Sequence, residues 1–308
     1  MKLGMIGLGR MGANMAERIR QHGHEVVGYD RNPDVSQASS LQALADQLGD
    51  SPKVCWVMVP SGTPTDAVIT ELSTLLGEGD VVIDGGNTFF RDSERHAAEL
   101  AEHGIRFVDV GTSGGVWGLQ EGYCLMSGGA PEDIELLTPI FDALAPPDGW
   151  AHVGPVGCGH YAKMVHNGIE YGLMHAYAEG YELLQSVDLD LDAEAAIKVW
   201  RQGSVVRSWL LDLLCLALEQ DPGLQGFSGY ASDSGEGRWT VNEAVRLAVP
   251  VPVISAALFA RFESRKEISP SMQVISALRA QFGGHSEQAI GRRPAESTED
   301  GTGKVRPG

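Results

Sequence analysis

Short apolar runs alternate with helix-like stretches through the first half of the chain. The runs lie at residues 2–6, 25–29, 53–59, 80–84, 105–110 and 123–126, and strand-like sequence ends near 150–153. Such alternation is typical of βαβ units built around a mostly parallel sheet. The first half is therefore predicted to be an α/β domain.

The second half has the periodicity of helices almost throughout. A long helix is expected over 161–184, followed by apolar stripes at 193–200, 206–219, 241–249, 253–263 and 272–282 that Pro and Gly residues separate. From residue 286 onward apolar residues almost vanish, so this segment cannot offset the entropy of folding. We predict an α/β domain over 1–157, an all-α domain over 158–285 and a disordered tail over 286–308.

A glycine motif, G-L-G-R-M-G at 7–12, lies between the first predicted strand and a helix predicted over 13–21. Glycines there permit a tight turn and a close approach of backbone to a pyrophosphate, whose charge lies at the helix N-terminus. A simple turn is the alternative, but strand, helix and a following acid together favour a Rossmann-type dinucleotide-binding domain. The predicted cofactor contacts are Gly7, Leu8, Gly9, Arg10, Met11, Gly12, Asp30, Arg31, Val59, Pro60 and Asn87.

The acid at the end of the second strand bears on the choice of cofactor. Asp30 can accept a hydrogen bond from a ribose 2′-hydroxyl and would repel a 2′-phosphate, which favours NAD. Arg31 is adjacent and could pair with a 2′-phosphate, so NADP stays possible.

The predicted long helix carries a set of proton-transfer residues. Lys163, His166, Asn167 and Glu170 follow i, i+3, i+4, i+7 spacing and share one face. A solvated face opposite an apolar one is the alternative. The position after a nucleotide domain and the residue types favour chemistry, with Lys163 as a general base and Glu170, about 10 Å along the axis, as a separate acid.

Composition narrows the class of partner. The 23 Lys+Arg against 41 Asp+Glu give a formal net charge of −18, which disfavours nucleic acid and acidic membrane surfaces. The longest uncharged stretch has 14 residues (247–260), too short for a membrane span, and no signal peptide is apparent. The four cysteines are scattered without metal-ligand spacing. We therefore expect a cytoplasmic protein without a metal site.

Several motifs together resemble one enzyme family. The run G-H-Y-A-K-M-V-H-N-G-I-E-Y-G at 159–172, D-G-G-N at 84–87, S-G-G at 113–115 and R-A-Q-F-G-G-H at 279–285 resemble the short form of decarboxylating 6-phosphogluconate dehydrogenase. The resemblance covers roughly residues 1–285. Related β-hydroxyacid dehydrogenases usually have Lys-x-x-Asn-Asn where this chain has K-M-V-H-N at 163–167.

The resemblance implies a reaction and a role for each matching residue. The match of Lys163 takes the proton of the substrate's 3-hydroxyl as hydride leaves for nicotinamide, carbon dioxide is lost, and the match of Glu170 protonates the resulting enediol to give ribulose 5-phosphate. No metal is required. The implied substrate contacts are Asn87, Ser113, Gly114, Gly115, His166, Asn167, Tyr171, Arg261, Arg279 and His285.

In the family, the matches of Arg279 and His285 reach the phosphate from a neighbouring subunit, which implies a homodimer or homotetramer. Without the resemblance, S-G-G would be an ordinary turn, and Arg261 and Arg279 would be surface residues paired with local acids such as Glu263. Two other functions stay open: a dehydrogenase of a small unphosphorylated 3-hydroxy acid, and a non-catalytic dinucleotide-binding module.

The chain departs from the long-form enzymes at one place. They read Lys-Gly-Thr-Gly-Lys-Trp where this chain has S-G-E-G-R-W at 234–239, so a cation is lost and an acid gained. Glu236 is expected either to bond a neighbouring arginine or to face solvent. Phosphate contacts from 234 or 236 are in doubt, which gives Arg261 and Arg279 more weight.

Overall fold

A computed structural model describes residues 1–50 and 52–283 of the chain. Its first part is a seven-stranded sheet in the order β2-β1-β3-β4-β5-β6-β7, in which all neighbours are parallel except β5 and β6. The strands are β1 (Lys2–Ile6), β2 (Glu25–Tyr29), β3 (Val54–Val57), β4 (Val81–Asp84), β5 (Arg106–Ser113), β6 (Cys124–Gly128) and β7 (Trp150–Gly154). The predicted α/β Rossmann-type fold is confirmed.

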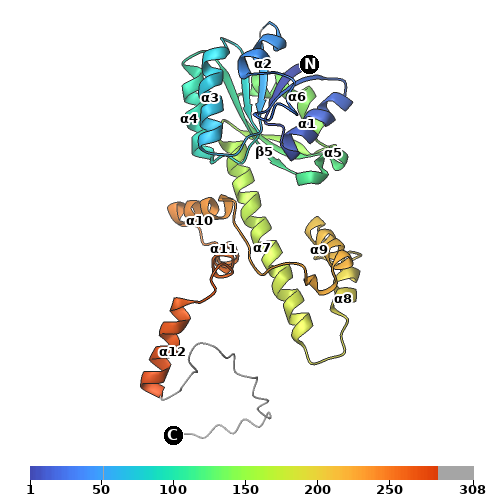
Figure 1. Ribbon diagram of the computed structural model, residues 1–308, viewed down its shortest axis with the longest axis vertical. Coiled ribbons are helices and arrows are strands. Elements are labelled where there is room, and N and C mark those ends of the chain that lie inside the picture. The colour runs from blue at the N-terminus through green and yellow to red at the C-terminus, as the bar shows by residue number, and fades with distance from the viewer. Residues whose placement is uncertain (51, 284–308) are drawn as a thin grey trace.

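Helices cover both faces of this sheet, and each face has its own apolar core (Figure 1). On one face lie α1 (Arg10–Gln21) and α6 (Pro131–Leu144), with α5 (Gly118–Glu121) and the short helix η1 (Gly115–Trp117) beside α1. On the other lie α2 (Leu41–Leu48), α3 (Thr63–Leu75) and α4 (Phe90–Ala101). Strands buried on both faces explain the nearly continuous apolar runs in the sequence.

The second part of the chain is built around α7 (Cys158–Ser186), which leaves the sheet domain as one long helix (Figure 1). α10 (Glu236–Leu247) and α11 (Pro252–Glu263) pack against α7, as do α8 (Ala193–Val199) and α9 (Trp209–Gln220) farther along it. The short helix η2 (Pro222–Leu224) follows α9, and α12 (Pro270–Gly283) extends away from the other helices (Figure 1). The predicted all-α second part is confirmed.

The start of α7 is anchored to the sheet by a buried carboxylate. Asp109 on β5 accepts hydrogen bonds from the backbone N–H groups of Gly157 and His160, both at 2.7 Å. These N–H groups belong to the first turn and have no partner within the helix. Burial raises the pKa of Asp109 above its ordinary value. The first turns of α7 therefore have a fixed position against the carboxyl end of β5.

The exact domain boundaries stay a prediction, and the predicted tail at 286–308 lies outside the described residues. None of the helices in the described part of the chain has the length and apolarity to span a bilayer. Of the four cysteines, Cys55 and Cys215 are buried, while Cys124 is exposed.

Candidate active site

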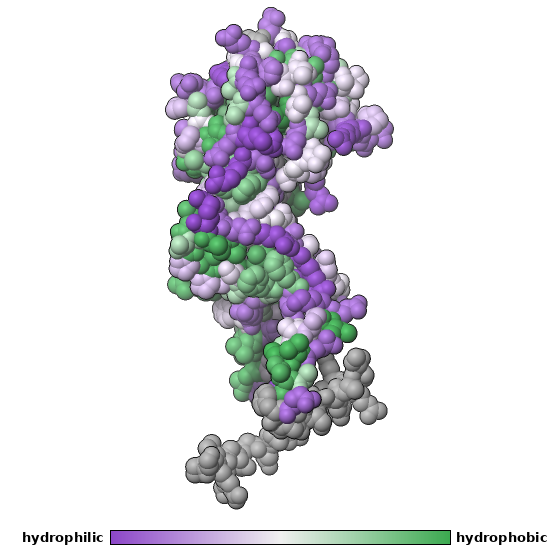
Figure 2. All heavy atoms as spheres, turned by 90° about the vertical axis from the view of Figure 1, so that its left-hand side faces the viewer, coloured by the Kyte–Doolittle hydropathy of each residue, from purple (hydrophilic) through white to green (hydrophobic). Residues whose placement is uncertain are grey.

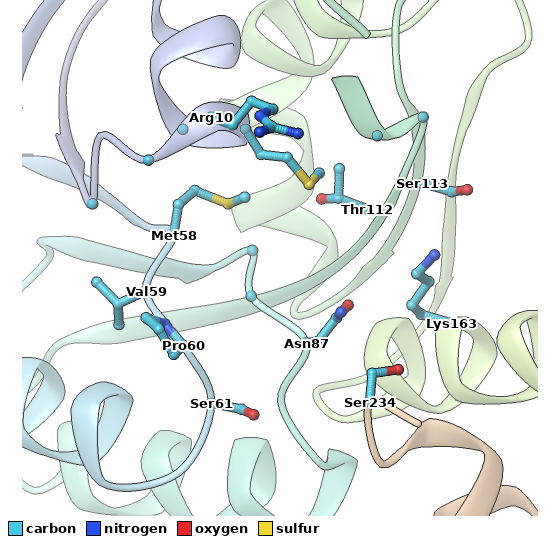
Figure 3. A pocket seen from close by; sticks show the side chains of 18 of the residues that line it. Arg10, Met58, Val59, Pro60, Ser61, Asn87, Thr112, Ser113, Lys163 and Ser234 are labelled. Carbon is cyan, nitrogen blue, oxygen red and sulfur yellow. The ribbon is translucent and has the colours of Figure 1, made fainter. Parts of the chain in front are cut away.

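One cavity of about 1640 Å³ lies between the carboxyl ends of the strands and the first half of α7. It brings together most of the residues that the sequence singled out, from both parts of the chain. Its lining includes Gly7, Gly9, Arg10, Met11, Gly12, Asp30, Arg31, Val59, Pro60, Asn87, Ser113, Gly114, Gly115, Lys163, His166, Asn167 and Glu170. Figure 3 shows the side chains of Asn87 and Lys163 directed toward the same space, with Ser234 nearby.

The glycine-rich loop has the geometry that a dinucleotide needs. A Cβ on Gly12 would lie 1.9 Å from the carbonyl oxygen of Gly7, so only glycine lets α1 begin this close to β1. A Cβ on Gly9 would meet nothing within 4 Å, which leaves open space above the loop. α1 has neither a side-chain cap nor an acidic residue in its first turn, so its N-terminal N–H groups can donate hydrogen bonds to an anion. The loop therefore fits the pyrophosphate of a nicotinamide dinucleotide.

Asp30 lies at the end of β2, at the adenosine end of this loop. One carboxylate oxygen accepts from the backbone N–H of Leu8 at 2.7 Å, and the other accepts from that of Asn32 at 2.8 Å. Leu8 does not line the cavity itself; its N–H holds Asp30 instead. Arg31 is exposed at the cavity edge.

Lys163 is buried, with 7% of its surface exposed, although it lines the cavity. The helix can approach β5 closely here because residue 111 is glycine: a Cβ on Gly111 would lie 2.4 Å from the Cβ of Lys163. Burial lowers the pKa of Lys163 below its ordinary 10.5, and the carboxylates of Glu170 and Glu236 only partly oppose that shift. A buried amine with a lowered pKa is suited to act as a general base.

The solvated-face alternative for α7 is wrong for Lys163 and Asn167, whereas the side chains of His166 and Glu170 are 38% and 37% exposed. Lys163 and Asn167 are buried, whereas Ile169 and Leu173, on the face expected to be apolar and inside, are 53% and 44% exposed. Lys163 and Asn167 therefore face the rest of the protein, while Met164 of the apolar set is also buried, at 2% exposed. α7 also contributes to a hydrophobic core, because Tyr171 packs against α11.

A chain of hydrogen bonds runs through this polar face. The side chain of His166 contacts Asn167 Oδ1 through Nδ1 at 2.8 Å, and Asn167 Nδ2 donates to Glu236 Oε1 at 2.9 Å. The other oxygen of Glu236 accepts from the Ser234 hydroxyl. Glu170 Oε2 lies 4.0 Å from His166 Nδ1. Both expectations for Glu236 are wrong: it is 2% exposed, and it bonds an amide and a hydroxyl.

Arg261 stacks on Tyr171, with its guanidinium carbon 3.6 Å from the ring centroid, and donates to the backbone oxygen of Ser232 at 2.9 Å. The alternative of an ion pair between Arg261 and Glu263 is wrong, because Glu263 pairs with Lys266 at 2.7 Å. The hydroxyl of Tyr171 accepts from the backbone N–H of Ser234 at 3.2 Å, which places Arg261 and Tyr171 just behind the cavity wall.

Four of the predicted site residues that the structure describes, Leu8, Tyr171, Arg261 and Arg279, do not line this cavity. Arg279 lies on α12 and is not among its lining residues, and His285 lies outside the described residues. Among the described residues no group of three His, Cys, Asp or Glu side chains is arranged to hold a metal ion.

Two family models cover the described chain almost completely. Residues 2–157 match the NAD binding domain of 6-phosphogluconate dehydrogenase, and residues 159–288 match the 6-phosphogluconate dehydrogenase C-terminal domain. The chain belongs to the 6-phosphogluconate dehydrogenase family.

Individual relatives agree with this membership. The chain is 43% identical to the NAD(+)-dependent, decarboxylating 6-phosphogluconate dehydrogenase of Haloferax volcanii, over 92% of this chain and 98% of that protein. It is 36% identical to the decarboxylating enzyme of Lactococcus lactis, but spans only 66% of its length. The solved 6-phosphogluconate dehydrogenase of Plasmodium falciparum superposes with a TM-score of 0.79 at 26% identity, over 96% of this chain and 67% of that one.

Within this family site, sequence reasoning missed several residues. Glu236 was left open, and Met58, Ser61, Thr112, Trp117 and Trp209 were not predicted although they line the cavity. Ser61 and Thr112 each lie two residues after a predicted strand (53–59 and 105–110), a position that could have suggested them. Trp209 comes from α9, and nothing in its local sequence points to a cavity.

Proposed function

We propose that this chain is a nicotinamide-dependent 6-phosphogluconate dehydrogenase that converts 6-phosphogluconate into ribulose 5-phosphate and carbon dioxide. The observation that carries the proposal is the position of Lys163: a buried amine with a lowered pKa that lines the same cavity as the glycine-rich loop. When the carbon of a secondary alcohol loses hydride, its hydroxyl must lose a proton, and the position of this amine supports a role as the base that takes that proton.

Oxidation of the substrate is the first step. Neutral Lys163 takes the proton of the 3-hydroxyl while Asn87 and the loop at 113–115 hold the sugar acid from the sheet side of the cavity. The nicotinamide ring of a bound cofactor would supply the acceptor for the hydride that leaves C3. The products of this step are a 3-keto acid and a protonated Lys163.

Loss of carbon dioxide follows because the new carbonyl accepts the electron pair of the breaking C1–C2 bond. Protonated Lys163 donates to the developing oxyanion, which gives an enediol. Glu170, in its protonated form, then donates a proton to C2 while Lys163 takes back the hydroxyl proton on C3. Lys163 and Glu170 are two turns apart on α7, so each can serve a different end of a short sugar acid.

NAD is the proposed cofactor, and the glycine-rich loop with Asp30 would hold it. The carboxylate of Asp30 is fixed by the N–H groups of Leu8 and Asn32. A fixed negative charge at this place accepts from a 2′-hydroxyl and repels a 2′-phosphate. Arg31 lies exposed beside it, which leaves NADP as a weaker alternative.

Arg261 and Tyr171 are proposed to bind the 6-phosphate. Arg261 is oriented by its stacking on the Tyr171 ring and by its bond to Ser232. A guanidinium held in this way loses little freedom when it binds a phosphate, which favours bidentate recognition.

A second copy of the chain is proposed to complete the site, in a homodimer or in a tetramer of such dimers. Apolar side chains gather on the surface of the helical part, at the level of α10 and α11 (Figure 2). Val245, Val253 and Phe259 are 77%, 65% and 58% exposed. Exposed apolar patches of this kind mark subunit interfaces. The α12 helix, which carries Arg279, extends away from the other helices (Figure 1), and this supports a role for Arg279 in the partner's cavity.

An assay of the purified chain tests the function. With 6-phosphogluconate and NAD we expect NADH and carbon dioxide in equal amounts, and no turnover of gluconate at comparable concentration. NADH without carbon dioxide, or turnover only with a small unphosphorylated 3-hydroxy acid, would contradict the proposal.

Hybrid dimers test the shared site. Lys163→Met and Arg279→Ala are each expected to be nearly inactive alone. After mixing and subunit exchange, a hybrid dimer contains one site with an intact lysine and an intact partner arginine, so activity should reappear. Continued inactivity of a verified hybrid would contradict a site built from two chains.

A further inference from the structure

Glu236 is a buried carboxylate just behind the cavity wall, in contact with the lining residues Asn167 and Ser234, and the reaction above does not use it. It begins α10 and is 2% exposed. Within residues 1–50 and 52–283 it forms no ion pair; its two oxygens accept from Asn167 Nδ2 at 2.9 Å and from the Ser234 hydroxyl. A buried carboxylate is costly unless both oxygens are bonded, so this placement calls for a specific purpose.

The Glu236 carboxylate determines the orientation of the Asn167 side-chain amide. A carboxylate only accepts hydrogen bonds, so the NH₂ end of Asn167 must face Glu236. The carbonyl end then faces His166 Nδ1 at 2.8 Å. If the Asn167 amide were flipped, its oxygen would lie against an oxygen of the Glu236 carboxylate, and neither oxygen would have a hydrogen-bond donor.

The orientation of the Asn167 amide determines which ring nitrogen of His166 carries the proton. An amide oxygen only accepts, so Nδ1 must be the N–H that donates to Asn167. In the neutral ring Nε2 then holds the lone pair and accepts hydrogen bonds. Glu170, at 4.0 Å from Nδ1, is too far to impose this tautomer.

We propose that Glu236 is a positioning residue that, through Asn167, holds His166 as the Nδ1–H tautomer. His166 thereby offers the substrate an acceptor at Nε2, which suits a sugar hydroxyl. The Ser234 hydroxyl donates a hydrogen bond to the second oxygen of Glu236. The backbone N–H of Ser234 in turn donates to the hydroxyl of Tyr171, which holds Ser234 in position. The role for substrate binding rests on the proposed function, whereas the tautomer does not.

Nitrogen NMR of the histidine rings tests the tautomer directly. In chain labelled with ¹⁵N-histidine, at a pH where His166 is neutral, one-bond and multiple-bond couplings distinguish Nδ1–H from Nε2–H, and His166→Gln identifies the resonance. We expect Nδ1–H in the wild type and in Glu236→Gln, which keeps an acceptor oxygen for Asn167. In Glu236→Ala and Glu236→Leu the Nε2–H form should appear. Leucine refills the volume in case the alanine variant does not fold.

Kinetics supply the second measurement. In Glu236→Ala and Glu236→Leu, kcat/KM for 6-phosphogluconate should fall roughly 10- to 100-fold, as expected for an unpaired buried polar group, with Kd for NAD unchanged. Glu236→Gln should stay near the wild-type value. Glu243→Gln is the matched control: Glu243 is a buried acid on the same helix, but it pairs with Arg246 and should leave tautomer and kinetics unchanged.

The result that would overturn the proposal is His166 remaining Nδ1–H in both the alanine and the leucine variant. An equal loss in Glu243→Gln would likewise overturn it, since the effect would then come from helix α10 as a whole. If the wild type does not turn over 6-phosphogluconate, the proposed function fails, while the NMR result still decides the role of Glu236.

Discussion

The two ends of the cavity are built in different ways. At the proposed cofactor end, the shape of the cavity comes from backbone geometry, with Gly7, Gly9 and Gly12 in one short loop. At the other end, the chemistry depends on side chains, with Lys163 and Asn167 buried on one face of α7. The first end tolerates little added volume, whereas the second tolerates little change in charge or hydrogen bonding. Substitutions should therefore separate binding of cofactor from turnover.

Lys163→Met should have the largest effect. Methionine retains the length and apolar stem of the side chain but cannot take a proton, so kcat should fall by about a thousandfold or more. Kd for NAD, measured by fluorescence titration, should stay near the wild-type value because the glycine-rich loop is untouched. Turnover within tenfold of wild type would remove Lys163 from the role of base.

The pH profile of the wild type should reflect the buried amine. The proposed oxidation step uses neutral Lys163, so the limb of the kcat/KM profile that rises with pH should report the pKa of this group in the free enzyme. Burial lowers that pKa, so the midpoint should lie below the ordinary lysine value of 10.5. A midpoint at or above 10.5 would show that the amine titrates as in water.

Substitutions of glycines in the glycine-rich loop should disrupt the cofactor end of the cavity. Gly12→Ala places a methyl group against the Gly7 oxygen and should lower the free energy of unfolding by about 1–3 kcal/mol as well as weaken NAD binding. Gly9→Ala meets nothing in the free protein, so its unfolding should be unchanged while Kd for NAD rises at least about tenfold.

Gly77→Ala is the matched control for both, because its methyl group also meets nothing and lies away from the cavity. It should change neither quantity. Normal NAD binding by Gly9→Ala would mean that the pyrophosphate does not pass over this loop.

Substitutions of Asp30 should have the smallest effect, a change in the preference for NAD over NADP. Asp30→Asn keeps an oxygen for the Leu8 N–H but removes the charge that repels a 2′-phosphate. The ratio of kcat/KM for NAD to that for NADP should fall by about tenfold, and Asp30→Ala should shift it in the same direction. An unchanged ratio in both variants would remove Asp30 from the adenosine site.

The sequence was most informative where a function depends on neighbouring residues. The glycine-rich loop and the polar face of α7 are each contained in fewer than 20 consecutive residues, and periodicity alone places their side chains together. The apolar runs likewise predict a mostly parallel sheet, because its buried strands must be apolar on both faces.

Contacts between distant segments could not be predicted in this way. Glu236 meets Asn167 only because α10 packs against α7, and periodicity contains no information on that packing. The orientation of α7 could be predicted only in part: the residue types pointed to Lys163 as a functional residue, but Ile169 and Leu173 are exposed, although an amphipathic pattern predicts that they are buried.

A crystal structure with NAD and 6-phosphogluconate bound would test the central claim most directly. The account predicts the Lys163 Nζ within about 3 Å of the oxygen on C3 of the sugar acid, with C3 facing the nicotinamide ring. A lysine amine that points away from that oxygen, with another side chain in hydrogen-bond contact with it, would contradict the account.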